Sequence, residues 1–261
     1  MGVTGESEAE VQALPDFERP PLTEVALGVV FEPVEIGAVG LAELSQRWRD
    51  EFPNVQEHTA LPPLFQPAQP GPGLVVEVGH PPLRLWMLTE AADRLVQVQR
   101  DRLVVNWRRI SDGEYPRYHA LRALLDRKVA DLWSFFHERT VPIPLPAAVE
   151  ATYVNTIDAA GFAEFLAGTP PFPERLGQPT EASVSVVFDT PGGIQPPQRV
   201  ALFSSRDRSV EGRYVLRVSV LGQLTAWDEW ERSMSAAHEQ AVRTFAEVTT
   251  RDMHQIWGRR T

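Results

Sequence analysis

Apolar and polar side chains alternate in several short segments of the chain, and a period of two is typical of half-buried strands. Longer segments carry apolar residues at spacings of three and four, which predicts amphipathic helices. The predicted strands cover residues 22–31, 83–89, 94–100, 102–110, 151–157, 182–189, 199–206 and 213–222. The predicted helices cover residues 38–52, 115–139 and 229–257, with a short one between Asp158 and Gly168.

The same order of elements occurs twice, with an offset of about 120 residues. Each half has a strand, a short helix, a Pro-rich loop, about three strands and a long helix. Strands that follow one another closely pair antiparallel, and amphipathic helices must cover one face of a sheet. The pattern predicts an α+β fold of two pseudo-repeated halves, with a curved antiparallel sheet and the helices on one face. In outline this is similar to the TATA-binding-protein and helix-grip folds.

The domain organisation follows from this repeat. Residues 1–19 are acidic and without periodicity, and are predicted to form a flexible tail. The first α+β half covers 20–140 and the second covers 149–261, with a stiff Pro-rich connector at 141–148. Two further Pro-rich segments, 61–82 and 169–179, are expected to be loops packed over the edge of the sheet. The alternative is that they recruit partners as extended polyproline segments.

Composition excludes several classes of chemistry. The chain has no cysteine, so disulfides, thiolate metal sites and a cysteine nucleophile are excluded. Its six histidines lack metal-ligand spacing, and we find no P-loop, no Rossmann glycine pattern and no G-x-S-x-G motif. We therefore expect no metal and no cofactor, and we assign no catalytic residue. No apolar run approaches the roughly 20 residues that span a bilayer, and the start has no secretory signal, which favours a cytoplasmic protein away from membranes.

Charge is unevenly distributed along the chain. The net charge is −10, and residues 1–57 hold twelve acidic and three basic residues. This balance argues against nucleic acid as a partner. Two basic zones, 94–109 and 199–217, nevertheless fall on predicted strands.

The basic zones form the first candidate site. Strand alternation places Arg102, Asn106 and Arg108 on the face opposite the apolar positions of their strand, and Arg213 and Arg217 alternate in the same way in the second half. These side chains are expected to form a concave surface that binds a protein or an anionic partner. The alternative is an ordinary solvated sheet face whose charges pair within the chain.

A second candidate site is a pocket between the sheet and the long helices. Its candidate residues are Trp107, Tyr115, Tyr118, His238 and Glu239. The first three lie at a junction between a strand and a helix, where ligands are often held. His238 and Glu239 form half of a zinc-protease motif whose second histidine is absent. The alternative is that the aromatic residues and His238 belong to the core.

Several motifs occur in an order that resembles one bacterial family. They are "PPLTEVALGVVF", "VQVQRDRLVVNWR" followed by "YPRY", "YVN", "AHEQAVRTF" and "IWGR". On these motifs the chain, from about residue 17 to its end, resembles a sporadically distributed family of uncharacterised function. The resemblance implies one folding unit and no particular activity.

Two functions are compatible with these observations. The first is a non-catalytic cytoplasmic binding or accessory protein, an adaptor or an antitoxin-like or immunity-like protein. It would hold a protein partner encoded nearby, or an anionic ligand, on its sheet face. The alternative is a small-molecule enzyme or carrier with a cavity between the sheet and the long helices, and a pocket of several hundred Å³ with convergent polar groups would favour it.

Overall fold

The computed structural model describes residues 13–61, 83–169, 182–190, 197–207 and 209–260. The strands are β1 (Leu22–Phe31), β2 (Asn54–Thr59), β3 (Leu83–Leu88), β4 (Arg94–Gln99), β5 (Arg102–Arg108), β6 (Pro146–Asp158), β7 (Ser183–Asp189), β8 (Gln198–Arg206) and β9 (Arg213–Gln223). The helices are α1 (Gly37–Arg47), α2 (Arg117–Glu138), α3 (Phe162–Phe165), a 3₁₀ turn η2 (Trp227–Glu229), α4 (Trp230–Val248) and α5 (Arg251–Ile256).

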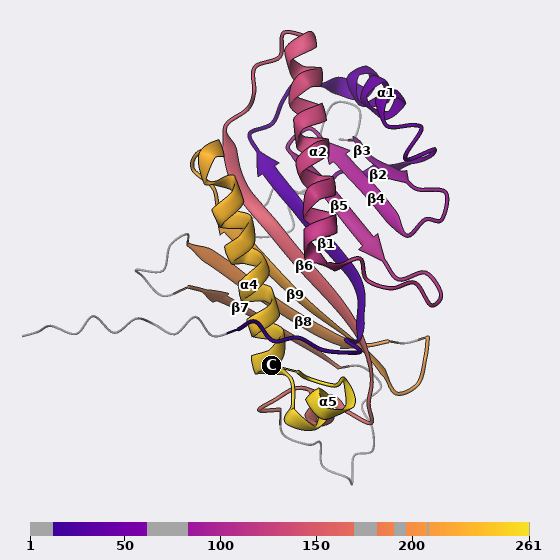
Figure 1. The fold of residues 1–261 in the computed structure, drawn as a ribbon, viewed down its shortest axis with the longest axis vertical. Coiled ribbons are helices and arrows are strands. Elements are labelled where there is room, and N and C mark those ends of the chain that lie inside the picture. The colour runs from indigo at the N-terminus through magenta and orange to yellow at the C-terminus, as the bar shows by residue number, and fades with distance from the viewer. Residues whose placement is uncertain (1–12, 62–82, 170–181, 191–196, 208, 261) are drawn as a thin grey trace, which may run out of the picture.

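The nine described strands form one curved, unclosed antiparallel sheet (Figure 1). Its order is β2-β3-β4-β5-β1-β6-β9-β8-β7, so β1 and β6 pair at the centre. The predicted α+β class with a curved antiparallel sheet is confirmed. On each side of the central pair the last strand of a half lies innermost and earlier strands lie further out. This order is the one that a duplication would give, and a common origin of the halves stays a prediction.

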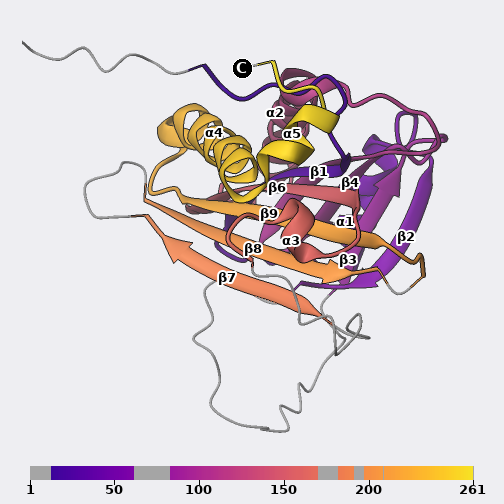
Figure 2. The same cartoon turned by 90° about the horizontal axis from the view of Figure 1, so that it is seen from below.

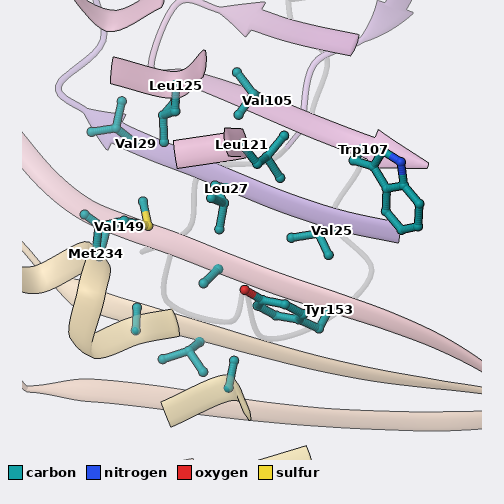
Figure 3. Close-up of a cluster of buried hydrophobic side chains, with 14 of the residues drawn as sticks. Val25, Leu27, Val29, Val105, Trp107, Leu121, Leu125, Val149, Tyr153 and Met234 are labelled. Carbon is teal, nitrogen blue, oxygen red and sulfur yellow. The ribbon is translucent and has the colours of Figure 1, made fainter. Parts of the chain in front are cut away.

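One face of the sheet carries the hydrophobic core. In register, Leu27 of β1 lies between Val105 of β5 and Ala151 of β6, and all three are fully buried. These side chains pack against Leu121 and Leu125 of α2 (Figure 3). Strand alternation therefore assigned the inward face of the central strands correctly.

The helices lie on this face of the sheet (Figure 2). α2 packs across β5 and β1, α4 packs across β6 and β9, and α1 packs on β3. Ion pairs tie α1 to the end of α2, one between Arg47 and Glu138 and another between Arg139 and Glu43. On the β2 side of the sheet, α1 and α2 thus cover the strands. On the β7 side, α4 covers only the strands next to the centre.

Two predicted helices end earlier than their apolar periodicity suggested. The helix predicted at 38–52 stops at Arg47, although Trp48 and Phe52 are still buried in the core beyond it. The helix predicted at 229–257 breaks at Thr249, which is extended and forms an isolated β-bridge with Leu166. The backbone N–H of Ala167 also bonds to the carbonyl of Val248. Because tertiary pairing takes over the backbone here, α4 and α5 become separate helices.

Other differences concern strands and the chain start. β2 was missed because its sequence, NVQEHT, has no apolar alternation. β6 begins at Pro146, inside the predicted connector, so 146–148 is sheet. The predicted tail is anchored before β1, since Phe17 is buried and forms an isolated β-bridge with Arg259. Most of the two Pro-rich segments, 61–82 and 169–179, lies outside the described residues.

Candidate functional site

A cavity of about 360 Å³ lies between the sheet and the two long helices. Its walls come from the chain segment before β1, the start of α2, the middle of β6 and the middle of α4. The lining residues are Leu14, Pro15, Asp16, Phe17, Pro20, Leu22, Tyr115, Arg117, Tyr118, His119, Tyr153, Asn155, His238, Ala241, Val242 and Phe245. Most of this lining is apolar, with a few phenol, imidazole and amide groups, as in sites for small molecules.

The sheet contributes the floor of the cavity. Tyr153 and Asn155 are two residues apart on β6 and therefore point to the same face. Leu22 of β1 also lines the cavity, although strict alternation from Val25 would turn it to the other side. A register shift between Leu22 and Glu24 against β6 allows this, because a bulge re-aims the side chains next to it.

Three aromatic side chains meet at the centre of the site. The hydroxyl of Tyr153 lies 2.6 Å from Nδ1 of His238. The ring of Tyr118 stacks on the His238 imidazole, with centroids 3.8 Å apart and planes within 5° of parallel. Burial, helped by the nearby His119, lowers the pKa of His238 to about 4. Burial also raises the pKa of Tyr153 well above its ordinary value. At neutral pH the imidazole is therefore uncharged and the phenol keeps its proton.

These protonation states determine which hydrogen-bonding groups remain available. We assign the Tyr153 hydroxyl as donor to Nδ1 of His238, which leaves the hydrogen of the imidazole on Nε2. The hydroxyls of Tyr115 and Tyr118 are buried and make no hydrogen bond of normal geometry within the described residues. Burial raises the pKa of Tyr115 to about 12, with the neighbouring Tyr153 hydroxyl opposing the shift. Two buried hydroxyls at the cavity wall therefore lack a hydrogen bond of normal geometry, and each has one weak polar neighbour, Tyr153 beside Tyr115 and Arg122 beside Tyr118.

The segment before β1 closes one side of the cavity. Phe17 packs on Phe245 with ring centroids 5.6 Å apart, and the backbone N–H of Arg19 bonds to the carbonyl of Trp257. At the rim, the guanidinium of Arg117 donates to Asp16 across 3.2 Å. Arg117 opens α2 with a φ of 70°, in the left-handed region that L-residues rarely adopt. This segment and the end of the chain hold each other against the cavity.

The basic sheet face differs from its prediction. Arg102 is 3% exposed and Asn106 is 2% exposed, so neither is available to a partner. Asn106 accepts a hydrogen bond from Gln97 (2.8 Å) and donates one to Glu24 (2.7 Å). Arg102 lies 3.4 Å from the carboxylate of Asp101. A buried polar side chain requires a hydrogen-bond partner. Arg102 and Asn106 have such partners within the chain, so their burial needs no external ligand.

The other three predicted arginines lie outside the buried network of Arg102 and Asn106. Arg108 is half-buried and donates to the carbonyl of Ala92 across 3.2 Å. Arg213 pairs with Asp158 at 3.0 Å, and Arg217 is exposed. The five residues therefore do not form the continuous concave binding surface that strand alternation suggested.

The same face holds a half-buried acid, Glu150, that sequence reasoning did not select. Burial raises the pKa of Glu150 on β6, while Arg102 and Arg217 act in the opposite direction. The hydroxyl of Thr152 donates to this carboxyl group across 3.2 Å and also lies 2.9 Å from the Ser219 hydroxyl. The contacts are internal, which makes this cluster a structural network.

The predicted pocket residues divide into two groups. Tyr115, Tyr118 and His238 line the cavity together. Trp107 lies behind the wall, with its ring 5.2 Å from that of Tyr115. Glu239 is exposed and does not line the cavity, because neighbouring residues on a helix point about 100° apart.

Sequence reasoning missed three contributors to the site. Tyr153 and Asn155 lie on the predicted strand "ATYVNTI", and their spacing of two was the available signal. Phe17 fell within the predicted tail, where one aromatic residue among acidic ones gave no period to read. Residues that long-range packing brings to the cavity cannot be predicted from the local sequence pattern.

The chain has no detectable relative among protein-family models, curated proteins or solved structures, and no sign of a metal site among its described residues. Across the described ranges, no three His, Asp or Glu side chains gather as metal ligands. None of the helices there is long and apolar enough to cross a membrane. The geometry of the cavity therefore carries the functional argument.

Proposed function

We propose that the protein binds a small molecule in the cavity between β6, α2 and α4. The observation that carries this proposal is the conjunction of space and hydroxyls without a well-formed hydrogen bond. About 360 Å³ is bordered by the buried hydroxyls of Tyr115 and Tyr118, which make no hydrogen bond of normal geometry to other described residues, although Tyr153 lies near the first and Arg122 near the second. A buried polar group without a partner costs about 1–3 kcal/mol, so a ligand that satisfies these groups gains affinity.

The polarity of the lining indicates the class of ligand. Tyr115, Tyr118 and Nε2 of His238 supply donors, and the neutral imidazole supplies no charge. Asp16 is the acidic residue of the lining and already contacts Arg117. The remaining walls are mainly apolar. This favours a small, mainly apolar molecule that carries a carbonyl or carboxylate group, and it disfavours cations.

A protein partner on the sheet face is the second candidate function. The region around Arg102 and Asn106 does not support it, because these side chains are buried. Exposed apolar and cationic side chains remain on the outer strands, where Phe203 of β8 lies beside Arg217 of β9 in register. A partner on this face would therefore have to contact the β7 side of the sheet.

Binding can be tested with three probes of similar size: phenylacetate, phenylacetamide and phenethylamine, which is a cation at neutral pH. Saturation-transfer NMR on the full chain should show binding of the first two and little binding of the amine. Equal binding of all three, or binding of the amine alone, would contradict the assigned donor character of the site.

Two substitutions locate the binding. Val242→Trp should fill the cavity, because Val242 lines it and is only half-buried, and binding of phenylacetate should be lost. Val39→Trp makes the same change on the exposed side of α1 and should leave binding intact. Tyr118→Phe should weaken phenylacetate binding about 2- to 10-fold, the effect of one hydrogen bond. Binding that survives Val242→Trp would place the site elsewhere.

A further inference from the structure

The β7 edge of the sheet exposes an unusual number of apolar side chains. On this seven-residue strand, Val186 is 38%, Val187 57% and Phe188 51% exposed. β7 is the last strand of the sheet order and pairs with β8 on one side only. Among the described residues no strand pairs with its outer backbone N–H and C=O groups, which can therefore pair with another strand. Edges of this kind are sites of association unless they are blunted or covered.

The helix side of β7 is only partly covered. Val184, Val186 and Phe188 line a groove of about 220 Å³, whose other walls include Leu202 of β8, residues 166–169 and Val248. At the other end of the sheet α1 packs on β3, whereas no described helix packs along β7. In Figure 2, β7 lies away from α4, at the margin of the sheet. The backbone edge of β7 thus lacks a partner strand among the described residues, and its helix-side face is left partly open as a groove.

We propose that β7 pairs with β7 of a second copy of the chain, antiparallel and centred on Val186. An antiparallel pair of identical strands has a two-fold axis, so one surface patch serves both copies. With Val186 opposite itself, Val184 lies opposite the second copy's Phe188, and Ser185 lies opposite its Val187. The apolar residues at 184, 186 and 188 of both copies then share one face and make a continuous strip.

Charge on the strand is compatible with this register. Asp189 is the one charged residue of β7, and it pairs with Arg199 of its own chain at 2.8 Å. In the proposed register it lies opposite Ser183, so no like charges face each other. The opposite edge, β2, contrasts with it: its sequence NVQEHT has one large apolar residue, Val55, and presents Glu57 and His58 instead. Pairing of two copies is therefore assigned to β7 rather than β2.

The absence of cysteine makes the register directly testable. Opposed residues of an antiparallel pair have Cα atoms about 4.5–5.5 Å apart, within the range that a disulfide bridges. Val186→Cys should therefore give a covalent dimer on mild oxidation. Val184→Cys is the matched control on the same strand and face, because its two copies would lie about 13 Å apart, four residues along the strand. Failure of Val186→Cys to cross-link above the control would overturn the proposal.

Self-association without cross-linking gives a second measurement. Sedimentation equilibrium of the full chain should yield twice the 29.2 kDa of one chain. Val186→Lys and Val186→Glu each place like charges opposite one another and should weaken self-association at least tenfold. An equimolar mixture of the two variants should restore the dimer. Val55→Lys on β2 is the control and should remain dimeric. A monomeric wild type, or a dimer unaffected by Val186→Lys, would overturn the proposal.

Discussion

The two ends of the sheet are built from similar strands and finished differently. At the β2 end, α1 packs on β3 and is tied to α2 by ion pairs. At the β7 end, α4 packs on β6 and β9, and the outermost strands expose Phe188 and Phe203. Strand alternation therefore predicts which residues share a face of a strand, but it does not predict which helix or loop covers that face.

On the sheet face away from the helices, the polar side chains are also more buried on β5, towards the β2 end, than on β9, towards the β7 end. On β5, Arg102 and Asn106 are buried and engaged with neighbouring side chains. On β9, Arg217 is exposed, and Arg213 is partly exposed beside Asp158. A similar pattern of polar positions thus makes an internal network at one end and an accessible surface at the other.

The largest test of this comparison substitutes one phenylalanine at each end. Phe52 precedes β2 and is 0% exposed, while Phe203 of β8 is 39% exposed. Phe52→Ala should lower the free energy of unfolding by about 3–5 kcal/mol, since it removes a fully buried ring and leaves a cavity. Phe203→Ala should lower it by less than about 1 kcal/mol. Urea unfolding followed by circular dichroism measures both. Equal losses would mean that the β7 end is packed as tightly as the other.

Acid should lower the free energy of unfolding through His238 of α4, which lines the cavity between the sheet and the long helices. Its pKa is about 4 in the fold and about 6.5 in an unfolded chain, so the unfolded chain binds the proton more readily. The stability that depends on neutral His238 is therefore complete above pH 6.5 and is lost as the pH falls from 6.5 to 4. The loss amounts to about 3 kcal/mol.

His238→Asn isolates this effect, because asparagine still offers an acceptor to Tyr153 and does not titrate. The difference in unfolding free energy between the wild type and this variant, measured in urea at several values of pH, should shift by about 3 kcal/mol in favour of the variant between pH 7 and pH 4. A difference that does not change with pH would show that His238 titrates normally.

The fold was predictable to the extent that it rests on local pattern. Alternation set the apolar positions of β5 opposite Arg102 and Asn106, and these positions, Leu103, Val105 and Trp107, are buried in the core. β2 escaped prediction because its side chains are polar and its position depends on backbone pairing with β3. The break at Thr249 escaped for a related reason, since Leu166, more than 80 residues earlier, takes over the backbone pairing. Long-range backbone pairing leaves no period in the sequence.

The cavity was predictable only in part. Tyr118 and His238 were selected as inward polar groups near the long helices, and they stack in the structure. Glu239 was selected from a motif fragment and is exposed. The hydrogen-bond partner of His238, Tyr153, lies 85 positions away on β6 of the same half, and its stacking partner Tyr118 comes from the first half. A site built between two halves needs the arrangement of the halves to be known before its residues can be grouped.

The smallest test compares one polar group on each end. Asn106→Ala leaves the amide of Gln97 and the carboxylate of Glu24 without their hydrogen-bond partner in a buried setting. We expect a loss of about 1–3 kcal/mol in the free energy of unfolding. Ser219→Ala removes a 2.9 Å contact with Thr152 on the other end, where water replaces the missing hydroxyl more easily. Its expected loss is about 0.5–1 kcal/mol, and chemical denaturation resolves the two. A larger loss for Ser219→Ala would reverse the contrast between a sealed and an open sheet face.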